Sequence, residues 1–339
     1  MRINKKINIH FFFRKPRSSG NFSIERTFES FIPFINKKHF KINKIVCPAV
    51  SKGFINRIFI IFWAFFKQGD INHVTGDINF ISLFFTKKTI TTFLDCFLLR
   101  KLKFIKLFFF KKFWVILPIK KSDYSVAISN QTKKELLNSC KFSENSILTI
   151  PVCYHRFLKK SNYRFNYKKT NILIIGTAKN KNIINSLKSL KNISCKVTII
   201  GELSEHIIKL LEKIDLDYLN YINLSNKEIN IQYKKSDIIL FPSTYEGFGL
   251  PIIEGQVCGR AVITSNISPM KDIAGVNGAC LVNPYKVKEI SKGILNIIKN
   301  KKYREKLISN GFKNSKKYSP KLIAKKYMSL YYKLSGFKI

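Results

Sequence analysis

The sequence has few acidic residues, with 20 aspartates and glutamates against 61 lysines and arginines, and a formal charge of +41. An excess of this size is typical of proteins that bind nucleic acid or an anionic surface. There is no zinc-finger spacing, RNP-like aromatic motif or isolated basic tail, so nucleic acid is not an expected partner. Two explanations stay open: contact with an anionic membrane or substrate, and codon bias in an A/T-rich genome, because lysine, isoleucine, asparagine and phenylalanine are abundant throughout.

Paired cysteines, a convincing signal peptide and a long apolar run are also lacking. The seven cysteines form no C-x-x-C pair and are odd in number, which predicts reduced, cytoplasmic thiols. The five dispersed histidines predict no metal site. No small-residue cleavage site follows the basic, apolar start. The longest apolar run, Ile58–Phe66, is far shorter than the ~20 residues that a membrane-spanning helix needs.

The chain is long enough for two domains, each with its own core. Strand-like and helix-like segments alternate, which favours α/β domains with parallel sheets. Expected strands are 7–13, 71–75, 89–93, 124–128, 171–175, 196–200, 218–222, 237–241, 261–264 and 279–282. In the first half, helices are expected at 22–31, 53–67, 98–114 and 131–139. A capping box, Ser225 with Glu228, opens a helix in the second half.

The polar stretch 159–170 marks the junction of the two halves. We therefore predict an N-terminal Rossmann-like domain at 1–160, a linker at 161–170, a second Rossmann-like domain at 171–319 and a last helix at 320–339. Two doubly wound domains in tandem place a ligand cleft at the carboxyl ends of their strands.

The most informative segment is Glu246–Glu254, in which two carboxylates bracket a glycine turn that opens a helix. Pro251 suits the first helical turn, and N–H groups near Gly249 and Leu250 would attract an anion such as phosphate. Carboxylates accept hydrogen bonds from paired hydroxyls, as in the ribose contacts of dinucleotide-binding folds. The segment therefore predicts a nucleotide joined to a second polyhydroxylated group.

Several further stretches extend this motif in order and spacing. They are 241–251 (FPSTYEGFGLP), 259–265 (GRAVITS), 281–284 (LVNP), 172–177 (ILIIGT) and Lys181-Asn182. With them, the chain resembles the retaining nucleotide-sugar glycosyltransferases of family 4, of the bacterial surface-glycan type. The resemblance implies the GT-B fold, in which two Rossmann-like domains face a central cleft and the last helix crosses back to the first domain.

The resemblance also implies roles for individual residues. Glu246 would contact the donor sugar, Glu254 the ribose hydroxyls and Lys181 the diphosphate. The expected donor contacts further include Gly176, Thr177, Gly247, Phe248, Gly249, Leu250 and Gly20. The implied partners are a UDP-, GDP- or ADP-linked sugar and a glycan or lipid-linked acceptor at the inner membrane face, with no metal or other cofactor. Thr177 stands where many relatives carry an arginine.

The first half departs from the family pattern in two places. Leu94-Asp95 stands where many members have His-Asp, so the acceptor contact lies elsewhere, at His73 or Asp95, or the chain is a catalytically weakened module that binds nucleotide sugar. His73 lies in NHVTGD (72–77) and is a candidate acceptor-side base, or equally a buried histidine satisfied by backbone. In the first loop, Ser18-Ser19-Gly20 replaces paired glycines.

A basic aromatic stretch, Arg100–Lys121, mixes lysine with phenylalanine and tryptophan at near-helical spacing. An amphipathic helix lying on anionic lipid has this composition. A core helix with a solvated basic face has it as well, so the pattern leaves both interpretations open.

Overall fold

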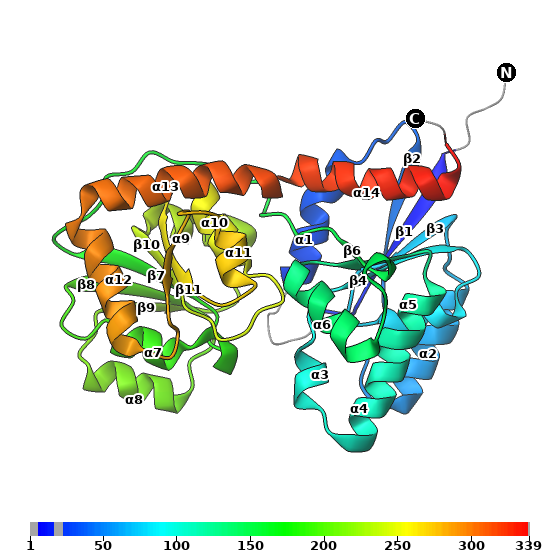
Figure 1. Ribbon diagram of the computed structural model, residues 1–339, viewed down its shortest axis with the longest axis horizontal. Helices are drawn as coiled ribbons and strands as arrows, with labels where there is room; N and C mark the ends of the chain where they lie inside the picture. The colour runs from blue at the N-terminus through cyan, green and yellow to red at the C-terminus, as the bar shows by residue number, and fades with distance from the viewer. Residues whose placement is uncertain (1–5, 17–22, 338–339) are drawn as a thin grey trace. The chain divides into compact units, whose positions relative to one another are not determined.

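The computed structural model describes residues 6–16 and 23–337. The chain divides into two compact units, one made of Met1–Cys153 with Pro320–Ile339 and the other of Tyr154–Ser319. Each unit contains a six-stranded parallel sheet with helices packed on it (Figure 1). The architecture is therefore the predicted pair of Rossmann-like α/β domains.

The first sheet has the strand order β2-β1-β3-β4-β5-β6. Its strands are β1 Ile7–Phe13, β2 Phe40–Val46, β3 Ile71–Val74, β4 Lys88–Phe93, β5 Tyr124–Ala127 and β6 Leu148–Thr149. The helices α1 Ser23–Phe31, α2 Phe54–Phe65, α6 Asn130–Cys140 and α14 Pro320–Ser335 belong to this unit. Strand β2, which we did not predict, is an edge strand whose polar residues hide its apolar alternation.

The core of the first unit is aromatic. Phe11 and Phe13 of β1 pack with Phe28 of α1 and with Tyr327 and Tyr331 of α14 in one buried cluster. A strand with the sequence INIHFFF can fill both faces of a buried parallel sheet, because apolar side chains point to either side. Helix α14 is thus part of the first unit's core, although the whole second unit precedes it in the chain.

The basic aromatic stretch is not the single helix expected at 98–114. It consists of α3 Phe97–Lys101, α4 Phe104–Phe110, a π-helical segment Lys111–Ile116 and α5 Leu117–Lys121. Leu102 is extended (φ −75°, ψ 151°) and separates α3 from α4. Residues on both sides of this break, Leu99 and Phe110, pack against the same core cluster. The break lets both sides of the stretch pack against this cluster, and helical periodicity in the sequence does not predict it.

The second sheet has the order β12-β11-β10-β7-β8-β9. Its strands are β7 Thr170–Ile175, β8 Cys195–Ile200, β9 Tyr218–Tyr221, β10 Ile238–Phe241, β11 Ala261–Ser265 and β12 Cys280–Val282. The helices are α7 Ile183–Lys188, α8 Glu205–Lys213, α9 Asn226–Lys235, α10 Leu250–Val257, α11 Met270–Ala274, α12 Val287–Lys299 and α13 Lys301–Ser315. All six predicted strands are present, and the Ser225–Glu228 capping box opens α9 as predicted.

The junction of the units differs from the expected linker at 161–170. The division falls between Cys153 and Tyr154, and the polar stretch belongs to the second unit. Tyr163 and Phe165 pack on that unit's core. The guanidinium of Arg260 lies 3.7 Å from the ring centroid of Tyr163, and that of Arg304 lies 4.0 Å from that of Phe165. The contacts of two aromatic side chains thus hold this stretch on the second unit, although its polar composition predicted a linker.

Candidate functional site

The predicted donor residues gather at one place in the second unit, where the strand order reverses. β7 and β10 are neighbours in the sheet, and the chain leaves them toward opposite edges. Loops that follow the carboxyl ends of two such strands form the ligand site of Rossmann-like domains. The two loops are joined here: the Thr244 amide donates to the Asn180 carbonyl (2.8 Å), and the Asn180 side-chain amide donates to the Tyr245 carbonyl (2.8 Å).

Lys181 and Glu246 form an ion pair across these loops, with 2.7 Å between Nζ and Oε1. Their side chains are 23% and 12% exposed, so the pair is shielded from water but not sealed off. The aliphatic stem of Lys181 lies on Gly176, where a Cβ would come within 3.0 Å of the lysine Cγ. Gly176 also has φ +87°, and both constraints favour glycine.

Asn182, next to Lys181, fixes the start of α7. It has a left-handed backbone (φ 59°), and its side-chain amide donates to the carbonyls of Pro242 (3.0 Å) and Pro284 (2.6 Å). The asparagine thereby ties the β7 loop to the segments that follow β10 and β12. Its part in the Lys181-Asn182 pair is structural, and it positions the lysine.

Helix α10 begins four residues after Glu246. The Phe241 ring lies 4.9 Å from Lys181 Nζ, and a Cβ at Gly249, the N-cap of α10, would be 3.7 Å from the same ring. Gly249 has φ +108° and no side chain to cap the helix, and Pro251 occupies the first turn. Gly255 lets the helix lie close to the sheet, because a Cβ there would come within 2.7 Å of Ile239 and 3.0 Å of Val262. The amino end of a helix attracts anions through its N–H groups and dipole.

Glu254 lies on the same helix and accepts a hydrogen bond from the Tyr233 hydroxyl at 2.6 Å. Tyr233 is on α9 and is fully buried. The tyrosine was not predicted as a site residue, because a lone tyrosine in a polar helix carries no motif. Its contact fixes the direction of the Glu254 carboxylate.

The other predicted donor contacts fall into two groups. Thr177, Gly247 and Leu250 are partly exposed, in the segments that follow β7 and β10. Phe248 is only 3% exposed, and its ring packs edge-on to Tyr318 with 5.6 Å between centroids, so it can offer a ligand its backbone alone. Gly20 lies outside the described residues.

His73 is not at a binding surface, which corrects the prediction of an acceptor-side base. It is fully buried, and its ring nitrogens lie 2.8 Å from the hydroxyl oxygens of Tyr331 and Thr92. Burial lowers the pKa of His73 to about 3, so the ring is neutral near pH 7. The buried alternative is closer to the structure, although side-chain hydroxyls and not backbone groups are its partners.

Leu94 and Asp95 also have structural contacts. The Leu94 side chain covers Gly76, where a Cβ would be 2.4 Å from the leucine Cδ1. The Asp95 carboxylate accepts from the Phe97 amide at 2.9 Å. A charged cluster lies after the carboxyl ends of β1 and β3, where Arg14 pairs with Glu25 (3.0 Å) and with Asp77.

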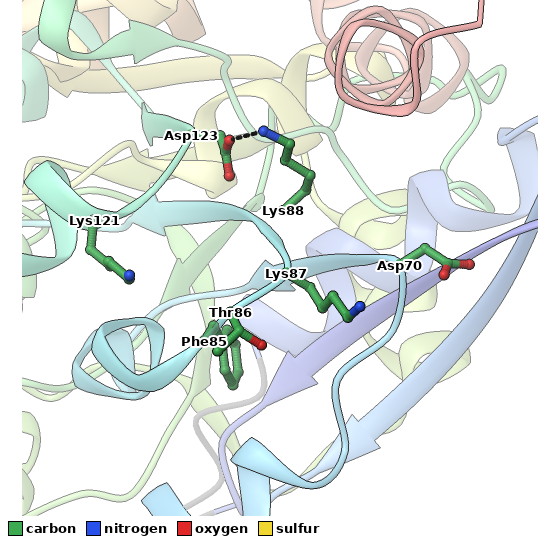
Figure 2. Close-up of a pocket in the computed structure, with 7 residues that line it drawn as sticks. All are labelled: Asp70, Phe85, Thr86, Lys87, Lys88, Lys121 and Asp123. Atoms are coloured by element: carbon green, nitrogen blue, oxygen red, sulfur yellow. Dashed lines mark hydrogen bonds and ion pairs between the residues drawn. The ribbon is translucent and has the colours of Figure 1, made fainter.

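A hollow in the first unit is lined by Asp70, Phe85, Thr86, Lys87, Lys88, Lys121 and Asp123 (Figure 2). It lies around the amino ends of β3, β4 and β5, and its Lys88–Asp123 ion pair measures 2.9 Å. Rossmann-like domains bind ligands at the opposite, carboxyl ends of their strands. The hollow is therefore not the candidate donor site.

Within residues 6–16 and 23–337, no three His, Cys, Asp or Glu side chains are grouped closely enough to hold a metal ion. The seven cysteines are free thiols. In that same part of the chain, no helix combines the length and the hydrophobicity needed to cross a bilayer.

Residues 156–314 match the family described as Glycosyl transferases group 1. The O-antigen chain mannosyltransferase B of Escherichia coli is 32% identical over 102 residues, 30% of this chain and 26% of that protein. An N,N'-diacetylbacillosaminyl-diphospho-undecaprenol alpha-1,3-N-acetylgalactosaminyltransferase of Campylobacter jejuni is 24% identical over 122 residues, 36% and 32% of the two chains. The chain thus spans about a third or less of each relative's length.

Among solved structures, Anabaena HepE in complex with UDP and glucose superimposes with a TM-score of 0.74 and 12% identity, covering 96% of this chain and 99% of that one. This likeness extends over both units and shows the fold. The GT-B fold is confirmed. Residues 156–314, which lie within the second unit, are similar to the glycosyl transferases group 1 family, in agreement with the resemblance to family 4.

Proposed function

We propose that this protein is a glycosyltransferase that moves a hexosyl group from a nucleotide diphosphate sugar to a glycan or lipid-linked acceptor, with retention at the anomeric carbon. The Lys181–Glu246 pair carries the proposal, because it stands at the strand-order reversal beside the amino end of α10. A cation and a helix N-terminus at one point suit a diphosphate.

In the transfer, the bond between the anomeric carbon and the diphosphate oxygen breaks, and a bond from that carbon to the acceptor oxygen forms. The acceptor proton passes to the departing diphosphate, so a separate protein base is not required. Lys181 and the first N–H groups of α10 stabilise the charge that grows on the leaving group. With these groups in place, we propose that transfer needs no divalent metal.

Glu246 and Glu254 contact different parts of the donor, the sugar and the ribose. Glu246 is held by Lys181 and orients the sugar, whereas Glu254 receives the ribose hydroxyls on a carboxylate that Tyr233 orients. Glu254 is half-buried, which strengthens a charge-assisted hydrogen bond to a ligand. The residues that we assign here to recognition of the nucleotide therefore lie in the second unit.

The acceptor is proposed from the relatives' names. One relative is an O-antigen chain mannosyltransferase, and the name of the other specifies an acceptor sugar on diphospho-undecaprenol. A surface glycan or its lipid carrier is therefore the acceptor class we propose, with the protein acting in the cytoplasm at the inner face of the membrane.

A panel of UDP, GDP and ADP sugars, screened for protection against thermal unfolding, tests the donor assignment, because a ligand of the native state raises its stability. One nucleotide series should protect the protein, and release of that nucleotide in the presence of acceptor should follow. Protection without turnover on any lipid-linked or glycan acceptor would favour the binding-module alternative, which Leu94 supports. An absence of protection by every member would contradict the donor site itself.

A further inference from the structure

Helix α2 exposes an entire apolar face on the first unit. Its residues Ile60 and Ala64 are buried against the sheet. On the outer side, large side chains between 38% and 81% exposed follow one another at helical spacing: Phe54, Ile55, Ile58, Phe59, Phe62 and Phe65, continued by Phe66. A helix that is apolar all round is normally covered on every side. Contiguous exposed apolar surface of this kind marks an interaction site.

Helix α4 presents a second apolar row, in which Phe104, Ile105, Phe108 and Phe109 are between 53% and 88% exposed. The two rows are linked through Trp114. Its ring stacks on Phe110 at the end of α4 (5.7 Å between centroids), and the Arg57 guanidinium of α2 lies 4.7 Å from its centroid. In Figure 1, α2 and the α4–α5 helices lie at the same end of the first unit. We call the exposed residues of 54–66 and 104–109 the two-helix face.

The two chain segments that carry this face have charges of one sign. Residues 50–68 contain three lysines and arginines, residues 96–122 contain eight, and neither segment contains an aspartate or glutamate. Lys103, Lys106 and Lys112 are exposed on or beside α4, and Lys52 and Lys67 are exposed at the two ends of α2. Glu135, which pairs with Arg100, comes from α6 outside these segments. The apolar rows are thus bordered by cations.

We propose that the two-helix face docks on an anionic lipid bilayer, with its phenylalanines and isoleucines in the interface and its lysines at the headgroups. Phenylalanine-rich helices with basic borders bind in this way, and α2 is too short to span the membrane. Each lysine near the surface strengthens binding by about fivefold. The chain thereby gains a peripheral membrane contact on the first unit, independent of the donor site.

Two other occupants fit the chemistry less well. A symmetric dimer would place the same patch against itself and bring the lysines of two copies together. Nucleic acid would match the charge, but its interfaces are polar, whereas the exposed side chains of the two rows are hydrocarbon. An anionic bilayer matches both the charge and the apolar surface.

The test is flotation of the full chain with vesicles of phosphatidylcholine alone or mixed with phosphatidylglycerol. Both tryptophans of the chain, Trp63 and Trp114, lie beside the face, so a blue shift of their emission gives a second measurement. The parent should float, and its emission should shift, with the mixed vesicles only. Equal flotation with both kinds of vesicle would overturn the charge part of the proposal, and no flotation with either would overturn it entirely.

Two variants separate the contributions of charge and burial. Replacing Lys103, Lys106 and Lys112 by glutamine should weaken vesicle binding on the order of 100-fold. Replacing Phe59, Phe62, Phe104 and Phe108 by glutamine should weaken binding at least about tenfold and abolish the blue shift, since buried hydrocarbon is lost. Matched controls on the second unit should bind like the parent: Lys209, Lys302 and Lys306 to glutamine, and Phe157, Ile222, Ile231 and Val276 to glutamine.

Thermal unfolding and sedimentation complete the experiment. The phenylalanine variant should unfold at or above the parent's temperature, because it removes exposed apolar side chains. Unchanged flotation of both variants would overturn the proposal, and a parent that dimerises without lipid through the same residues would assign the face to a second copy. Protection by nucleotide sugars is measured without vesicles, so failure of membrane docking and failure of the donor site are distinguishable.

Discussion

Glu254 receives its orientation from a tyrosine that is itself buried, which makes the carboxylate a preorganised acceptor. Glu254→Ala should weaken nucleotide binding by about 1.5 to 3 kcal/mol, the value of a hydrogen bond to a charged group. Tyr233→Phe should weaken it by less than Glu254→Ala and leave turnover at saturating donor close to the parent's. Calorimetric titration with the protective nucleotide measures both effects. Unchanged affinity in Glu254→Ala would remove the ribose assignment.

Lys181 supplies the positive charge in the proposed transfer, and its stem also fills the space above Gly176. Lys181→Met keeps most of the stem and removes the charge, so kcat should fall about 10²- to 10³-fold, as for other lost transition-state donors. Lys181→Arg should retain more activity than Lys181→Met. Addition of EDTA should leave the parent's rate unchanged; a rate that EDTA abolishes and magnesium or manganese restores would contradict a metal-free leaving-group contact.

His73 makes the first unit sensitive to acid. Because burial lowers its pKa to about 3, the unfolded chain binds a proton at this residue at a higher pH than the native state does. Its contribution is therefore fully present above the unfolded pKa near 6.5 and is lost as pH falls toward 3, by at most about 1.4 kcal/mol per pH unit.

His73→Gln should accordingly be less stable than the parent at pH 7, with a difference that narrows toward pH 5. Urea unfolding of both proteins at the two pH values measures this. A difference that stays constant would mean that the histidine does not titrate as a buried base. At neutral pH, the rate profile of the parent should show no inflection from this residue.

At the scale of elements, the contact of α10 with the sheet controls the site. Gly255→Ala places a methyl group 2.7 Å from Ile239 and 3.0 Å from Val262, so α10 must shift or the strands must yield. We expect a loss of about 1 to 3 kcal/mol in unfolding free energy, typical of overpacking. Nucleotide affinity should fall as well, because Glu254 moves with the helix. Unfolding in denaturant, with and without nucleotide, distinguishes the two effects.

Elements with strong local signals were predictable, and those decided by packing were not. The apolar run at 238–241 predicts a buried strand, and the Ser225–Glu228 capping box predicts a helix start, each from a few neighbouring residues. Strand β2 does not, since its polar residues interrupt the alternation. The prediction of one helix at 98–114 is wrong, because the backbone of Leu102 is extended and interrupts the helix. The same limit holds for sites: the motif located Lys181, Glu246 and Glu254, but it could not reveal that His73 is buried or that Tyr233 reaches Glu254.

At the scale of the molecule, the positive charge has two different explanations in different parts of the chain. The formal charge is +41, and lysine is abundant throughout the chain, as codon bias would produce. Around the two-helix face, however, an acid-free composition coincides with exposed phenylalanine, a combination that codon bias alone does not place on one surface. Composition could not separate these two cases, because both add lysine and phenylalanine. The exposure of the phenylalanines in the folded unit distinguishes them.

The place of α14 in the first unit bears on the order in which the protein is made. The first unit's core includes Tyr327 and Tyr331, and the Tyr331 hydroxyl is a partner of His73. On the ribosome, residues 320–335 emerge only after the entire second unit, 154–319, has been synthesised. The second unit can therefore complete its fold first. Until α14 is synthesised, the aromatic core formed by β1 and α1 of the first unit remains incomplete. During that interval we expect the aromatic side chains of β1 and α1 to be accessible to chaperones, because α14 does not yet cover them.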